Sequence, residues 1–136
     1  MFDNYIAAHG LAAIVDSSSG FSIKADKGSA YIRPHSANQL MGWIYYALPS
    51  PPPGNDTLKK LAIDFSSTAA YVSAVHVYLG NNEVYKADNM QQASSFTEDI
   101  SSSQAVFKDK GILVAIHVVF DSVAASFHFQ SVSIGI

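Results

Sequence analysis

The segment from Gly111 to Phe120 reads GILVAIHVVF, and its apolar residues occupy both faces of an extended strand. Such a run is typical of a central strand that is covered on both sides. In a two-sheet sandwich the second cover has to come from outside the sandwich. The segment therefore predicts a homo-oligomer in which Val118 and Val119 lie at the interface between subunits.

Segments rich in Val, Ile, Tyr, Phe and Ser recur along the chain, separated by clusters of Gly, Pro, Asn, Asp and Ser. This pattern is typical of an all-β domain. The chain is expected to form about ten short strands, which predict either two packed sheets or a closed barrel. Of these we favour an all-β, two-sheet antiparallel β-sandwich of the jelly-roll type in a single domain, residues 1–136. We expect these strands at Leu11–Asp16, Phe21–Ala25, Ala30–Arg33, Leu40–Leu48, Leu58–Ser66, Tyr71–Leu79, Glu83–Lys86, Phe96–Ile100, Gly111–Phe120 and Ala125–Ile134.

Local patterns also predict turns and buried faces. The turn-forming cluster from Asp16 to Gly20 is expected to join the first two of these strands as a hairpin, and the cluster from Gly80 to Asn82 to join another pair. In the strand that begins at Leu58, alternation places Leu61, Ile63 and Phe65 on the buried face.

Composition excludes several classes of protein. The 136 residues include 8 Lys+Arg against 11 Asp+Glu, a formal net charge of -3, and no cysteine. Without clustered basic residues a nucleic-acid groove is not expected, and without cysteine there is no disulfide scaffold. The acidic N-terminus lacks a signal-peptide pattern and the longest apolar run is too short to span a bilayer as a helix. We therefore expect a soluble, cytoplasmic protein without a membrane partner.

The histidines suggest one candidate metal site. If the connection from Asp121 to Ala124 closes a hairpin centred between its two middle residues, the pairing rule places His117 opposite His128. His76 joins the same face if its strand is a neighbour, and such imidazoles could bind a divalent metal in a metal-dependent enzyme. The other interpretation is that these histidines are hydrogen-bonded residues of the core or an interface. No nucleophile elbow or glycine-rich phosphate loop is present, so an enzyme is the less favoured interpretation and no other cofactor is expected.

Aromatic residues form the second candidate site. In the segment GWIYY, alternation places Trp43 and Tyr45 on one face of a strand and Tyr46 on the other, so at least one large ring is expected at the surface. The proline-rich loop that follows contains Asn55 and Asp56. These five residues are the candidate site for a carbohydrate or a small apolar ligand. The competing interpretation makes Trp43 an anchor of the core.

The quoted segments resemble a protein family. His9-Gly10, the stretch from Gly42 to Pro49 followed by a proline-containing loop, and Val75-His76-Val77-Tyr78 are similar to a family of small, uncharacterised bacterial proteins predicted to be β-sandwiches. The SPPPG loop from Ser50 to Gly54 is longer here than in that family. The resemblance covers most of the chain and implies the fold, but no activity.

The leading functional interpretation is a non-catalytic binding or assembly module, lectin-like or specific for a small apolar ligand, which associates with itself. The alternatives are the metal-dependent enzyme and a purely structural homo-oligomer. Substitution of Trp43 separates a lectin-like site from a histidine site, because each would depend on different side chains.

Overall fold

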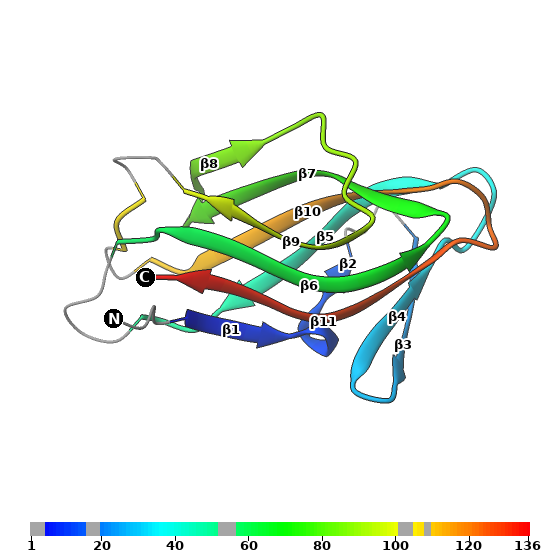
Figure 1. Ribbon diagram of the computed structural model, residues 1–136, viewed down its shortest axis with the longest axis horizontal. Coiled ribbons are helices and arrows are strands. Elements are labelled where there is room, and N and C mark those ends of the chain that lie inside the picture. Colours follow the sequence, from blue (N-terminus) through cyan, green and yellow to red (C-terminus); the bar gives the residue numbers. More distant parts are fainter. Residues whose placement is uncertain (1–4, 16–19, 52–56, 101–104, 108–109) are drawn as a thin grey trace.

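The chain folds into two facing antiparallel β-sheets (Figure 1). The computed structural model describes residues 5–15, 20–51, 57–100, 105–107 and 110–136. The six-stranded sheet contains β1 (Tyr5–His9), β3 (Ser22–Asp26), β4 (Ser29–Arg33), β6 (Lys60–Thr68), β9 (Ser94–Asp99) and β11 (Ser126–Gly135). The five-stranded sheet contains β2 (Ile14–Val15), β5 (Met41–Leu48), β7 (Ala70–Leu79), β8 (Asn82–Ala87) and β10 (Ile112–Phe120).

The order of the strands confirms the predicted jelly-roll type of sandwich. The six-stranded sheet runs β3-β4-β11-β6-β9 with β1 beside β11, and the five-stranded sheet runs β2-β5-β10-β7-β8. From β4 to β11 the chain changes sheet at every connection except the β7–β8 hairpin. That hairpin turns at Gly80, whose φ of 63° lies in the left-handed region, as the sequence predicts for this turn. Within the described residues the only helical element is the 3₁₀ turn η1 (Gly10–Ala12), so none of their helices could cross a membrane.

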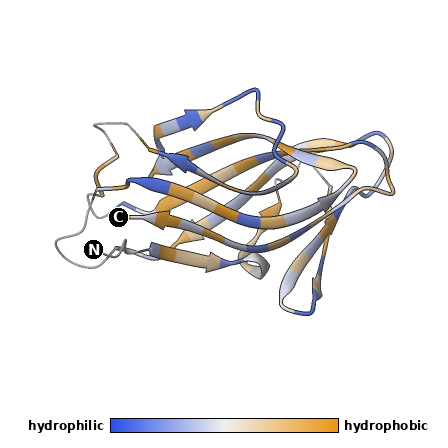
Figure 2. Ribbon diagram, viewed as in Figure 1, coloured by the Kyte–Doolittle hydropathy of each residue, from blue (hydrophilic) through white to orange (hydrophobic). Residues whose placement is uncertain are grey.

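Alternation along the strands builds the core between the sheets. On β6, Leu61, Ile63 and Phe65 are buried while Lys60 and Asp64 are exposed, which confirms the predicted faces. Apolar segments follow the central strands of both sheets (Figure 2). The long strands β5, β6, β7, β10 and β11 each bury one face, because an alternating pattern places apolar side chains inward and polar ones toward water.

Aromatic rings fill the middle of this core. Phe65, Phe127 and Phe129 form mutual contacts with centroid separations of 5.2–5.7 Å, and Phe120 packs against Phe127 at 5.3 Å. Burying one such ring stabilises the fold by roughly 2–3 kcal/mol. Residues from β6, β10 and β11 therefore hold the two sheets together.

The predicted hairpin around Asp16 to Gly20 is wrong. β2 pairs with β5 in the five-stranded sheet, whereas β3 pairs with β4 in the six-stranded sheet. The connection crosses from one sheet to the other, and its residues 16–19 lie outside the described part of the chain. The sequence analysis also missed β1, a short strand whose buried residues are only Ile6 and Ala8.

The predicted hairpin between the last two strands is wrong as well. β10 pairs with β5 on one side and β7 on the other, while β11 pairs with β6 on one side and with β1 and β4 on the other. Both edges of each strand are occupied, so the two strands cannot pair with each other. The loop after Phe120 instead carries the chain between the sheets, and the prediction of β10 as a central strand is confirmed.

Candidate functional site

The outer face of the five-stranded sheet carries a group of aromatic and histidine side chains. β10 lies between β5 and β7, and its register places His117 beside Trp43 and places Ala115 between Tyr45 and His76. Side chains of these residues share the outer face because they occupy alternate positions of their strands. Three segments that are far apart in the sequence thus meet on one surface.

These residues surround a hollow of about 250 Å³. It is lined by Trp43, Tyr45, His76, Tyr78, Glu83 and Ala115. Ala115 is only 2% exposed although it lies on the outer face and outside the core cluster, so the surrounding rings cover it. Its short side chain keeps the middle of the hollow open.

Trp43 is held between two imidazole rings. Its ring centroid lies 4.9 Å from that of His76 and 4.9 Å from that of His117, with interplanar angles of 54° and 64°. Aromatic pairs favour such tilted arrangements, which contribute about 0.5–1.5 kcal/mol beyond the buried area. The predictions that Trp43 and Tyr45 share one face and that a large ring lies at the surface are confirmed, and the competing interpretation of Trp43 as a core anchor is wrong.

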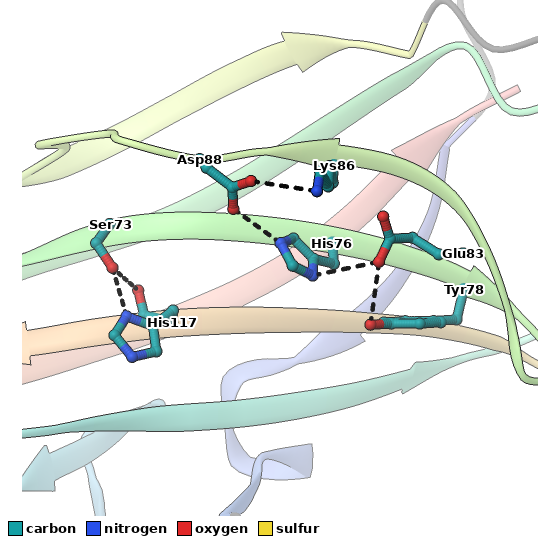
Figure 3. Close-up of polar contacts among 7 residues, drawn as sticks. All are labelled: Ser73, His76, Tyr78, Glu83, Lys86, Asp88 and His117. Carbon is teal, nitrogen blue, oxygen red and sulfur yellow. Dashed lines mark hydrogen bonds and ion pairs between the residues drawn. The ribbon is translucent and has the colours of Figure 1, made fainter.

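His76 is the centre of a polar network at the edge of the hollow (Figure 3). Its Nε2 lies 2.9 Å from Asp88 Oδ1, and its Nδ1 lies 3.6 Å from Glu83 Oε2. The hydroxyl of Tyr78 donates to the same oxygen of Glu83 at 3.4 Å. Lys86 lies on the far side of Asp88, with its Nζ 3.8 Å from Oδ2.

The network changes the ionisation of two of its members. The hydrogen bond from His76 lowers the pKa of Asp88, so that this carboxyl group stays ionised well below neutral pH. Burial raises the pKa of Tyr78, and the charge and hydrogen bond of Glu83 raise it further, so that the phenol stays a donor. The hollow itself is lined by the carboxylate of Glu83, the phenol of Tyr78 and the imidazole of His76.

His117 is paired with a serine of the neighbouring strand. A β-bulge in the pairing of β10 with β7 leaves Ser73 as the extra residue, and its Oγ lies 2.5 Å from His117 Nδ1. Burial lowers the pKa of His117, and the neighbouring His76 lowers it further. His117 is therefore neutral at pH 7 and supports the ring of Trp43 as an uncharged aromatic group.

Tyr46 does not belong to the candidate site, which corrects the sequence analysis. It is fully buried on the core face of β5, and its hydroxyl donates to the carbonyl oxygen of Gly10 at 3.0 Å. Alternation sends it inward, as it sends Trp43 and Tyr45 outward. The two other proposed ligand residues, Asn55 and Asp56, lie outside the described residues.

The three histidines of the candidate metal site do not converge. His76 and His117 flank Trp43, but His128 lies on the six-stranded sheet, where it packs on Tyr31 and where its Nε2 lies 3.2 Å from Asp26 Oδ2. The expectation that His117 faces His128 is wrong because β10 and β11 belong to different sheets. In the described part of the chain no group of three or more His, Asp or Glu residues is placed to hold a metal ion.

The two proposed interface residues point to opposite sides of the five-stranded sheet. Val118 is fully buried in the core, so its placement at an interface is wrong. Val119 is half-buried on the outer face, next to Met41 of β5 and Tyr71 of β7. The apolar run of β10 is thus covered by the other sheet on one face and by the aromatic rings of its own sheet on the other.

Three polar residues of this surface were missed by the sequence analysis. Glu83 lines the hollow because the β7–β8 hairpin pairs it with Tyr78, and Asp88 follows the end of β8 and contacts His76. The predicted turn from Gly80 to Asn82 contains the signal for Glu83, because the turn sets the register of the residues next to it. The sequence contains no such signal for Ser73, because the bulge that points its side chain toward His117 arises from the pairing of distant strands.

The fold and this surface define a jelly-roll β-sandwich with an aromatic hollow on the outer face of one sheet. No protein-family model and no curated protein matches the sequence. Among solved structures, the chain is similar to the low-affinity xylan-binding module CBM86 of Roseburia intestinalis, with 9% identity, a TM-score of 0.57 and coverage of 96% of this chain and 94% of that one.

A second similar structure is an enzyme. It is the Stig cyclase Fisc of Fischerella sp. TAU, in complex with (3Z)-3-(1-methyl-2-pyrrolidinylidene)-3H-indole, with 10% identity, a TM-score of 0.53 and coverage of 100% of this chain and 90% of that one. At such identities the likeness establishes the β-sandwich fold and leaves the function to be argued from the site.

Proposed function

We propose that this protein is a non-catalytic carbohydrate-binding module whose site is the hollow around Trp43. One observation carries the proposal: Trp43, Tyr45 and Tyr78 line an outward-facing hollow together with the polar side chains of His76 and Glu83. A rigid sheet supports all of these side chains, and a preformed site loses little entropy on binding.

The chemistry of the hollow suits a sugar ring. The C–H faces of a sugar are apolar and pack on aromatic rings, while its hydroxyl groups need donors and acceptors at the edge of the ring. Trp43 supplies the largest ring, and Glu83, His76 and Tyr78 supply the polar edge. The same fold in a xylan-binding module supports this proposal, because it is a precedent for glycan binding by such a sandwich.

Tryptophan fluorescence provides a direct test, because Trp43 is the one tryptophan of the chain. Titration with oligosaccharides of xylose, mannose, glucose and glucosamine, with and without N-acetyl groups, is expected to change its emission with at least one of them. Calorimetry should then find that Trp43→Ala weakens binding of that glycan by at least about tenfold, as expected for the loss of a central aromatic contact.

A matched control lies on the opposite sheet. Tyr31 is a half-buried ring on the outer face of β4, where it packs on His128. Tyr31→Ala is expected to leave glycan affinity unchanged. Equal losses in the two variants, or no response to any glycan, would contradict the proposed site.

Self-association is the alternative role of the same face. Leu113 and Val119 are half-buried apolar residues on the outer face of β10, at either side of the hollow. A second copy of the chain packed there would cover Trp43. Native mass spectrometry tests this alternative: a dimer that dissociates in the variant Val119→Lys and binds glycan only after dissociation would favour it over the proposed module.

A further inference from the structure

In its neutral form, the ring of His76 places one hydrogen-bond acceptor beside another. Its hydrogen bond to Asp88 assigns the proton of the neutral ring to Nε2, so Nδ1 carries a lone pair. That lone pair lies 3.6 Å from Glu83 Oε2, an oxygen that can only accept hydrogen bonds when ionised. With a neutral ring, two acceptors therefore lie side by side at the rim of the hollow, which favours a ligand that brings hydrogen-bond donors.

The hydroxyl group of Tyr78 does not satisfy both of these acceptors. Its hydroxyl donates to Glu83 Oε2 at 3.4 Å, which satisfies one lone pair of the carboxylate and none of His76. A sugar hydroxyl group could donate its one proton to only one of the two acceptors. A protonated amine offers three donors and could bridge both.

The charges and the aromatic rings around the hollow also favour a ligand that carries an ammonium group. Lys86 pairs with Asp88, with 3.8 Å between Nζ and Oδ2, which leaves Glu83 as the excess negative charge of the group when histidine is neutral. The rings of Trp43 and Tyr45 line the same hollow, and the faces of such rings attract cations. The described residues offer no group of three potential metal ligands, so a metal ion is the less suitable cation.

We infer that the glycan bound in the hollow carries a primary amine, and that its ammonium group lies between His76 Nδ1 and Glu83 Oε2. This inference rests on the proposed carbohydrate-binding function and narrows the ligand to an amino sugar that is not N-acetylated. The sugar ring packs on Trp43, while the ammonium group donates to both acceptors and neutralises the charge of Glu83.

The experiment compares three tetrasaccharides at pH 7 by the fluorescence of Trp43 and by calorimetry. These are the tetramers of glucosamine, N-acetylglucosamine and glucose, which differ at the amine position. The glucosamine tetramer is expected to bind about tenfold more tightly than the other two, since a charge-assisted hydrogen bond is roughly twice as strong as a neutral one. Glu83→Gln is expected to bring the ratio of the dissociation constants close to one.

Glu98→Gln is the matched control. Glu98 accepts a hydrogen bond from Tyr85 at 3.4 Å, as Glu83 does from Tyr78, but it lies on β9 and does not line the hollow. This variant should keep the preference for the glucosamine tetramer. A loss of preference in Glu98→Gln as large as in Glu83→Gln would overturn the inference.

The remaining outcomes separate the inference from the proposed function. Equal binding of the three tetramers would overturn the amine assignment and leave the carbohydrate module intact. Binding of spermidine as tight as that of the glucosamine tetramer would overturn the assignment to a sugar. If no glycan bound, the proposed function would fail and this inference with it.

Discussion

Trp43 of β5 and His76 of β7 meet across β10 with their ring centroids 4.9 Å apart, although Trp43 is paired with His117 and His76 with Ala115. Strands in a sheet are about 4.8 Å apart, so the backbones of β5 and β7 are separated by roughly 10 Å. The two rings bridge that distance diagonally, because the residue of β10 beside Trp43 is His117, whose ring also packs on Trp43. Ala115, which lies between Tyr45 and His76, has a short side chain that leaves room for the hollow.

Ala115→Leu is expected to fill the hollow and abolish ligand binding. The added atoms would occupy the space between Tyr45 and His76, while the core side of β10 keeps its packing. Glycan affinity should fall by at least about tenfold, and the free energy of unfolding should change by less than about 2 kcal/mol. Ala47→Leu is the control, because Ala47 is exposed at the end of β5 and does not line the hollow. Unchanged affinity in Ala115→Leu would contradict this interpretation of the hollow.

Tyr46→Phe should lower stability without affecting the ligand site. The buried hydroxyl of Tyr46 donates to Gly10, whose carbonyl oxygen also accepts a hydrogen bond from the amide of Ala13 at 3.3 Å. Because the carbonyl oxygen of Gly10 keeps the hydrogen bond from Ala13, the free energy of unfolding, measured by urea denaturation, is expected to fall by about 1 kcal/mol. The variant Tyr31→Phe, which removes the hydroxyl of a half-buried tyrosine on the other sheet, should cost clearly less. A similar cost in both variants would argue against the buried hydrogen bond.

Gly10→Ala is expected to be among the most damaging substitutions in the chain. A Cβ at this position would lie 1.7 Å from the carbonyl oxygen of Phe129, so the backbone of η1 or β11 would have to move. We expect a loss of about 3 kcal/mol or more, or a failure to fold. Gly111→Ala provides the comparison, since a Cβ there meets nothing within 4 Å. Thermal denaturation of both variants checks the prediction, and equal melting temperatures would refute it.

The lowered pKa of His117 predicts that stability falls as the pH falls below neutral. The unfolded chain takes up a proton near the ordinary histidine value of 6.5, while burial keeps the folded imidazole neutral to a lower pH. Between these two pKa values the unfolded state binds more protons, so the contribution of His117 is fully present above pH 6.5 and is lost below it. Urea denaturation between pH 7 and pH 5 should therefore show a smaller loss of stability in His117→Gln than in the unmodified protein. The same slope in both would contradict the prediction.

Local sequence patterns were enough to predict the two-layered sandwich and the faces of several of its strands. Alternation in β6 placed Leu61, Ile63 and Phe65 in the core, and the same rule placed Trp43 and Tyr45 together on one face of their strand. The glycine at the β7–β8 turn predicted the one hairpin that the site depends on. These predictions succeeded because the side-chain period and the turn conformation are properties of neighbouring residues.

The pairing of strands that are distant in the sequence could not be predicted in the same way. The hairpins predicted at Asp16 to Gly20 and at Asp121 to Ala124 both assumed that consecutive strands are partners, whereas in this fold consecutive strands mostly belong to opposite sheets. The pairing of a strand depends on which distant segments compete for its two edges. The residues of a connection do not indicate whether it will cross from one sheet to the other.

The sequence by itself therefore determined which side chains share a face of each strand, so that Trp43 and Tyr45 lie on one side of β5 and Tyr46 on the other. Only the tertiary structure decided that the Trp43 side of β5 faces away from the core and that β10 lies between β5 and β7, which brings His76 beside Trp43 and leaves His128 on the other sheet. The reason is physical: burial follows a periodicity that is encoded locally, whereas strand order results from the packing of the whole chain.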